Sequence, residues 1–284
     1  MEPNWAAIVL ARWLYYGAVM ALFGSSLFPL YALVGRDPTP AMLPRAANIT
    51  LALAALVAAS GWLLGFTATL VGPEGWSDTL KAILLESSFG PLWGVRLVGA
   101  LLLLGATVLR HPTWIAVLAL ILLACEGWSG HAAAWGLAGS ITMVVHVVSA
   151  SAWIGGLVPL GRFVRAAQQH RYSITGAQVV LLRFSHLGVA AVSLIAVTGV
   201  VNTWRMLAMV PDPMDAYGRV LLAKIVLFGF MLVLATTNRY WLMPQLGGPG
   251  RPLGALVRSI VMEQALAAGV LLAVSALGLM DPSM

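Results

Sequence analysis

Long apolar stretches alternate with short polar interruptions along the whole chain. A helix needs roughly 20 apolar residues to cross the hydrocarbon core of a bilayer, and eight stretches reach or approach that length. They cover residues 5–34, 46–71, 91–109, 114–127, 137–160, 184–210, 220–243 and 255–280. The interruptions contain proline and glycine, which are typical of turns. We therefore predict an all-α fold, a polytopic membrane bundle of eight transmembrane helices.

The fourth stretch is the weakest of these predictions. It is short, it ends at Cys125 and Glu126, and only residues 110–112 separate it from the third stretch. We expect a helix there that barely crosses the bilayer.

Composition supports lipid as the main surroundings of the chain. Of the 284 residues, 60% are hydrophobic and only 9% are charged, whereas a soluble domain carries about 25% charged residues. No interruption is long enough to hold a separate soluble domain, so we expect one integral-membrane domain over residues 1–284. The single cysteine, Cys125, excludes an intramolecular disulfide and a cysteine-cluster metal site.

The distribution of charge predicts the orientation of the bundle. The net charge is +6, but the cations are scattered singly, so nucleic acid is not an expected partner. One alternate set of interruptions holds most of the arginines, and the opposite set holds most of the acids. Cation-rich loops usually face the cytoplasm. With eight spans, this predicts a multi-pass protein whose termini both face outward, which in a Gram-negative cell means the periplasm. The arginines concerned are Arg36, Arg45, Arg110, Arg162, Arg165, Arg171, Arg183, Arg239, Arg251 and Arg258.

An ionisable side chain lies deep in the fifth stretch. His146 is there, and Met143 is three residues earlier, on the same face of a helix. Ionisable groups at bilayer depth are costly and often functional, and imidazole and thioether groups suit Cu(I). The alternative is a neutral histidine that hydrogen-bonds to a neighbouring helix.

Further candidate metal ligands lie near the predicted outer face: Glu126, His131, Met206 and Met209. The alternatives are a helix-end carboxylate in water, a solvated loop histidine and packing methionines. A helical path would separate His131 from His146 by about 20 Å. They can share one metal only if the loop before the fifth stretch folds back into the bundle. Otherwise they form two separate sites, an outer one and a deeper one.

Other charged residues also fall within apolar stretches. Glu263 lies close to the middle of the last one and is predicted either to belong to a buried pair or to carry protons. Lys224 is near enough to the outer end to extend toward water. We interpret Arg12 and Arg96 as structural tethers between helices.

Several short motifs, taken together, resemble the CopD family of inner-membrane copper-resistance proteins. They are WSGHA at 128–132, His146 followed by WIGG at 153–156, RFS at 183–185, GVVNTW at 199–204, YGRVLLAK at 217–224, and NR at 238–239. The resemblance covers about residues 90–245. It implies a role in copper tolerance, with copper moved across the inner membrane toward the cytoplasm, beside a periplasmic copper-binding partner, CopC.

The leading hypothesis is therefore a copper-binding inner-membrane protein that accepts copper, in its cuprous form, at the periplasmic side. It then moves the ion toward the cytoplasm or passes it to a partner. One alternative is a membrane redox protein with b-type haem or quinone, or a metal reductase. Another is a structural or chaperone-like component without a ligand. Enzymatic activity is not expected, because no catalytic motif is present.

Overall fold

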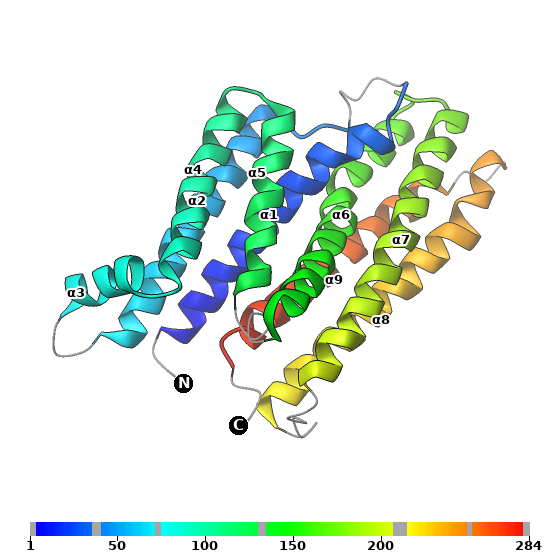
Figure 1. Ribbon diagram of the computed structural model, residues 1–284. Coiled ribbons are helices and arrows are strands. Elements are labelled where there is room, and N and C mark those ends of the chain that lie inside the picture. Colours follow the sequence, from blue (N-terminus) through cyan, green and yellow to red (C-terminus); the bar gives the residue numbers. More distant parts are fainter. Residues whose placement is uncertain are drawn as a thin grey trace.

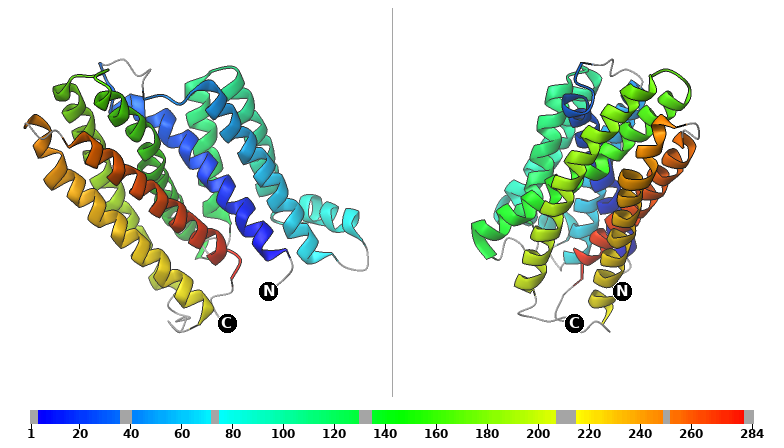
Figure 2. Two further views of the ribbon diagram at one scale, coloured as in Figure 1. Left: turned by 180° about the vertical axis from the view of Figure 1, so that it is seen from behind. Right: turned by 90° about the vertical axis from the view of Figure 1, so that its right-hand side faces the viewer.

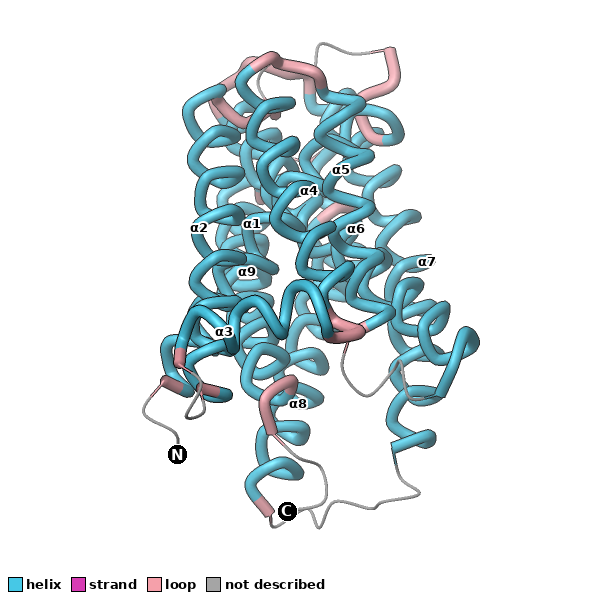
Figure 3. Tube along the Cα trace, turned by 60° about the vertical axis from the view of Figure 1, so that its left-hand side comes forward, coloured by secondary structure: helices cyan, strands magenta, loops and turns pink. Residues whose placement is uncertain are grey.

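The computed structural model describes residues 4–35, 41–71, 75–129, 135–206, 215–248 and 252–280. Over these residues the chain is almost entirely helical and contains no strand (Figure 3). The α-helices are α1 Trp5–Tyr31, α2 Arg45–Leu70, α3 Trp76–Lys81, α4 Gly90–Val108, α5 Pro112–Ala124, α6 Gly136–Gln168, α7 Ile174–Met206, α8 Ala216–Thr237 and α9 Leu253–Leu277. Shorter π and 3-10 segments follow some of them: η1 Ala82–Glu86, η2 Cys125–Trp128, η5 Asn238–Leu242 and η6 Pro244–Gly247.

Seven of the described helices are long and apolar enough to cross a membrane, and a shorter apolar helix covers Pro112–Trp128. The shorter helix is the fourth predicted span, so the expectation of a short helix is confirmed. Successive spans run in opposite directions, and both termini lie at the same end of the bundle (Figure 1). The predicted polytopic helical bundle is therefore confirmed. We call the end with the termini the outer end and the opposite, arginine-rich end the inner end.

One short helix was not predicted. The segment between the second and third spans forms α3 and η1, which project from the bundle at its outer end (Figure 1). Asp78 in its first turn and Lys81 in its last turn form an exposed ion pair at 3.1 Å. Opposite charges at these positions favour a helix, because they complement its dipole.

The spans form two packed groups that share α1. One apolar core joins α1 to α2, α4 and α5, and a second joins α6, α7, α8 and α9 to the inner end of α1. In the second group α8 and α9 lie side by side on one flank (Figure 2). This arrangement makes α1 the central helix, with α6 as its main partner in the second group.

Glycines bring α1 and α6 into backbone contact. A Cβ atom on Gly155 would lie 2.0 Å from the carbonyl oxygen of Met20, and one on Gly24 would lie 2.2 Å from the carbonyl carbon of Gly155. Small residues at helix crossings allow such close approach in membranes. The WIGG motif at 153–156 therefore fixes the position of α6, the helix that carries His146.

A buried ion pair holds the outer half of the first group together. Arg96 of α4 donates to Glu126 of η2 at 2.9 Å, and both side chains are almost fully buried. The guanidinium carbons of Arg96 and Arg12 each lie 4.4 Å from the ring of Trp62 on α2. The prediction that Arg96 tethers helices is confirmed, and Arg12 makes a cation–π contact between α1 and α2.

Candidate metal centre

His146 is held between two helices in the outer half of the bundle. It lies about 15 Å along α6 from Gly136, given a rise of about 1.5 Å per residue. Its Nδ1 atom is 2.9 Å from the hydroxyl oxygen of Thr198 on α7. Thr198 is buried and His146 is partly buried. The imidazole is therefore fixed by a bond to a neighbouring helix, as polar side chains in membranes often are.

The bonds of Thr198 determine which imidazole nitrogen carries the proton. The Thr198 hydroxyl donates to the carbonyl oxygen of Leu194 at 2.5 Å, so its single proton is already used. Nδ1 of His146 must then be the donor to Thr198. In this neutral tautomer Nε2 carries a lone pair. Metal-binding histidines are commonly oriented in this way, with one nitrogen bonded to the protein and the other free for the metal.

Gly199 gives the imidazole its place beside α7. A Cβ atom at this position would lie 3.5 Å from Cε1 of His146, in ordinary van der Waals contact with the ring. The backbone of α7 thus passes close to the Cε1 and Nδ1 atoms of the imidazole. Gly199 belongs to the GVVNTW motif, and Thr198 directly precedes it.

A thioether and an ammonium group also belong to the surroundings of His146. Met143 lies one turn nearer the outer end of α6 and, like His146, is partly buried. Lys224 of α8 is also partly buried and lies within electrostatic reach of His146. The centre thus combines one imidazole, one thioether on the same helix face and a neighbouring ammonium group.

Glu126 is buried rather than solvated. It is only 7% exposed. Its Oε1 accepts from Arg96, and its Oε2 accepts from Tyr16 at 2.8 Å and from Ser129 at 3.0 Å. The alternative of a helix-end carboxylate in water is therefore wrong, because the 3-10 turn η2 directs this side chain into the bundle. To bind a metal, Glu126 would have to give up bonds to α1 and α4.

The remaining predicted ligands cannot be placed. His131 and Met209 lie outside the described residues. Met206 is the last residue of α7, and its side chain is not described. Their roles stay predictions, as does the choice between one shared site and two separate sites.

The other described histidines lie away from this centre. His111, His170 and His186 are exposed and belong to the inner half of the bundle, as the sequence predicts. Within the described ranges, no group of three or more His, Cys, Asp and Glu residues could hold a metal ion. A site at His146 would therefore depend on sulfur ligands or on residues outside those ranges.

Thr198 is the functional candidate that sequence reasoning missed. A threonine in an apolar helix usually bonds to its own backbone, and Thr198 does so as well. Its position next to the motif glycine was the one available signal. Its pairing with His146 depends on how α6 and α7 are rotated against each other, which the sequence does not show directly.

Two family models match the chain. The model described as "Copper resistance protein D-like, N-terminal domain" matches residues 1–140, and the model described as "Copper resistance protein D" matches residues 178–277. The matched residues include the first two spans and the last. The similarity therefore extends beyond residues 90–245, where the short motifs are found.

Curated relatives cover nearly the whole chain. Copper resistance protein D of Pseudomonas syringae pv. tomato is 28% identical over 97% of both chains, and inner membrane protein YebZ of Escherichia coli (strain K12) is 25% identical over 98% of both. Copper transport protein CutJ of Bacillus subtilis (strain 168) is 27% identical over 84% of this chain and 46% of its own length. No solved structure matches. These matches and the membrane-spanning bundle show that the chain belongs to the copper resistance protein D family.

Proposed function

We propose that this protein binds cuprous copper at His146 after the ion enters from the periplasmic side, and that it moves the ion toward the cytoplasm or passes it to a partner. The observation that carries the proposal is the bond between His146 and Thr198, which leaves Nε2 free for a metal. Family membership supplies copper as the substrate. Met143 supplies a soft second ligand on the same helix face.

The proposed site suits transient binding. A cuprous ion at this depth loses water, and coordination by nitrogen and sulfur offsets that loss. The ammonium group of Lys224 repels the bound cation, which weakens the site. Conduction needs sites that are strong enough to accept the ion and weak enough to release it.

The outer end would collect the ion. We assign this role to His131, Met206 and Met209, which the sequence predicts near the outer face. We assign Glu126 a supporting role beside these three residues and not the role of a ligand, because its charge is already paired with that of Arg96.

We further propose that the arginine-rich inner end faces the cytoplasm of a bacterial cell and that the termini face the periplasm. In that orientation a periplasmic CopC-like chaperone would deliver copper at the outer end. The cation-rich and cation-poor ends of the bundle support this orientation, and the relative named as an inner membrane protein supports the compartment.

Uptake of Cu(I) into proteoliposomes tests the proposal. We expect His146→Ala to reduce the initial uptake rate at least tenfold, while His170→Ala, which removes an exposed imidazole, leaves it unchanged. Met143→Leu should reduce it less than His146→Ala, because the imidazole of His146, the main proposed ligand, remains. Equal uptake by wild type and His146→Ala would contradict the proposal.

A further inference from the structure

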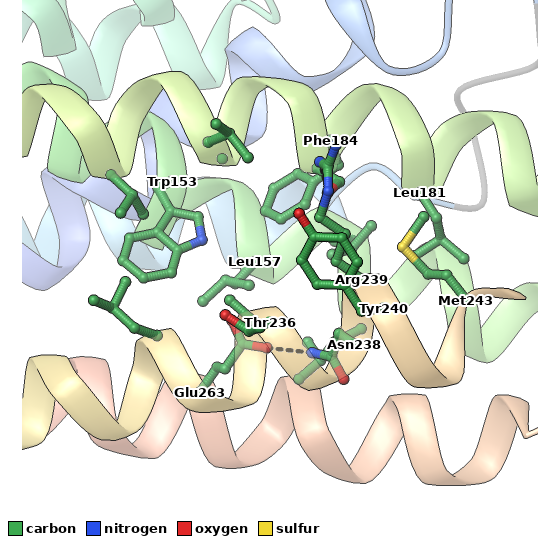
Figure 4. A pocket seen from close by; sticks show the side chains of 18 of the residues that line it. Trp153, Leu157, Leu181, Phe184, Thr236, Asn238, Arg239, Tyr240, Met243 and Glu263 are labelled. Carbon is green, nitrogen blue, oxygen red and sulfur yellow. Dashed lines mark hydrogen bonds between the residues drawn. The ribbon is translucent and has the colours of Figure 1, made fainter.

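A cavity lies further inward along the same helices that hold His146. It has a volume of about 240 Å³ and is lined by residues of α6, α7, α8 with η5, and α9 (Figure 4). Trp153 lies at its outer end (Figure 4) and follows His146 by about 10 Å along α6. The ring of Trp153 packs edge-to-face against Phe228 of α8, with ring centroids 6.2 Å apart. An aromatic pair therefore separates the proposed copper site from the cavity.

One acid lines this cavity. Glu263 of α9 is 2% exposed, and its Oε1 accepts a hydrogen bond from Nδ2 of Asn238 at 2.5 Å (Figure 4). Within the described part of the chain no cation pairs with it, so the predicted alternative of a buried ion pair is not found there. A buried carboxyl without a cationic partner is costly as an anion. While the cavity contains no cation, the protonated form of Glu263 is therefore lower in free energy than the carboxylate.

The other ionisable groups around the cavity do not neutralise Glu263. Arg239 and Tyr240, both from η5, also line it, while α6 and α7 contribute no ionisable side chain. Nη1 of Arg239 donates to Oγ of Ser185 on α7 at 2.5 Å, which directs this group away from Glu263 (Figure 4). The carboxyl and the guanidinium thus lie on different sides of the cavity.

The cavity extends toward the inner end. Its lining follows η5 to Met243, beside the final turn η6. Its volume is well above the 10–15 Å³ that one water molecule requires. Water in the cavity would carry a proton between Glu263 and the inner side without passing the Trp153–Phe228 pair.

We infer that Glu263 is a proton-exchanging counter-charge for the transported ion, an inference that rests on the proposed function. When the cavity is empty, the carboxyl is protonated. When a cuprous ion passes Trp153, the O–H bond of the carboxyl breaks, the proton leaves to the inner side, and the carboxylate balances the charge of the ion. The copper keeps its oxidation state, and the net charge of the cavity is unchanged. When the ion leaves to the inner side, the carboxyl takes a proton back from that side, so each cycle moves one copper ion and no net proton across the membrane.

Glu263→Gln separates this role from a structural one. Glutamine has the same shape, and its carbonyl oxygen can still accept the bond from Asn238, so the contact between η5 and α9 is kept. Glu86→Gln, at an exposed acid of the outer end, is the matched control. Cu(I) binding in detergent should be equal in wild type and in both variants, because His146 is intact.

The test measures Cu(I) uptake into proteoliposomes while the pH on the inner side of the protein is varied. We expect the uptake rate of wild type and Glu86→Gln to fall as that pH is raised, because the carboxyl must take a proton from that side in each cycle, and Glu263→Gln to lose at least 90% of uptake at every pH. Uptake by Glu263→Gln at the wild-type rate would overturn the inference, as would a wild-type rate that does not depend on that pH.

Infrared spectroscopy in the absence of copper keeps the two proposals distinguishable. We expect wild type to show a buried-carboxyl band that titrates with pH and is missing in Glu263→Gln. If wild type takes up no copper, the transport proposal and the counter-charge role of Glu263 both fail, and the band then reports on the proton site alone. Absence of the band in wild type would overturn the proton site whatever the uptake result.

Discussion

The imidazole of His146 on α6 donates through Nδ1 to the hydroxyl of Thr198 on α7, across a distance of 2.9 Å. This one bond fixes both the rotation of the ring and the nitrogen that remains free. It also makes α7 a determinant of the proposed copper site, although α7 contributes no ligand to it within the described residues.

Replacing Thr198 by valine should weaken copper binding without removing a ligand. Valine has nearly the same shape but cannot accept the bond, so the ring loses its orientation and its fixed tautomer. Loss of such a supporting partner typically lowers metal affinity 10–100-fold. Competition with a Cu(I) chelator in detergent measures the change. Thr198→Ser, which keeps the hydroxyl, is the control, and equal affinities for the two variants would show that the bond does not support the site.

The buried pair of Arg96 and Glu126 should be more sensitive to loss of one partner than to loss of both. Glu126→Gln leaves a guanidinium buried without a counter-charge, which typically lowers the free energy of unfolding by about 3–5 kcal/mol. The double variant Arg96→Met with Glu126→Gln should recover part of this loss. Unfolding in mixed micelles provides the measurement.

An exposed ion pair serves as the comparison for that experiment. Asp78→Asn removes the charge opposite Lys81, and both side chains are more than half exposed. Such pairs contribute about 0–1 kcal/mol. A loss for Glu126→Gln as small as that for Asp78→Asn would mean that the buried pair does not hold η2 in place.

The crossing of α1 and α6 should tolerate no side chain at Gly155. An added Cβ atom would meet the carbonyl oxygen of Met20 at 2.0 Å, so the two helices must separate. We expect Gly155→Ala to lower the unfolding temperature, with a loss of at least the 1–3 kcal/mol typical of overpacking. Gly17→Ala in α1, where nothing lies within 4 Å of the added atom, is the matched control. Equal unfolding temperatures for the two variants would contradict the described crossing.

The haem alternative makes a different spectroscopic prediction. A bis-histidine haem needs two histidines at matching depth, and the described histidines other than His146 are exposed and belong to the inner half. We therefore expect no Soret band in the purified protein. A Soret band that disappears in His146→Ala would favour the redox alternative instead.

The spans could be predicted because each depends on a local property. Length and apolar character are sufficient to recognise a membrane helix, and even the weak fourth span was placed correctly. Contacts between distant residues were harder to predict. Glu126 seemed to end a helix in water, but its partners Tyr16 and Arg96 come from helices that are far away in the sequence.

In the candidate site, too, local features could be predicted from the sequence and contacts between helices could not. His146 and Met143 were recognised from their chemistry and their spacing on one helix. Thr198 and the pairing of Glu263 with Asn238 depend on the rotation of packed helices, and apolar sequences without a strong polar stripe leave that rotation undetermined.

X-ray absorption of the Cu(I)-loaded protein tests most directly whether His146 binds the copper ion. We expect one imidazole nitrogen and at least one sulfur in the first shell of wild type, and loss of the imidazole signal in His146→Ala but not in His170→Ala. An unchanged imidazole signal in His146→Ala, or a wild-type spectrum without imidazole, would contradict binding at His146.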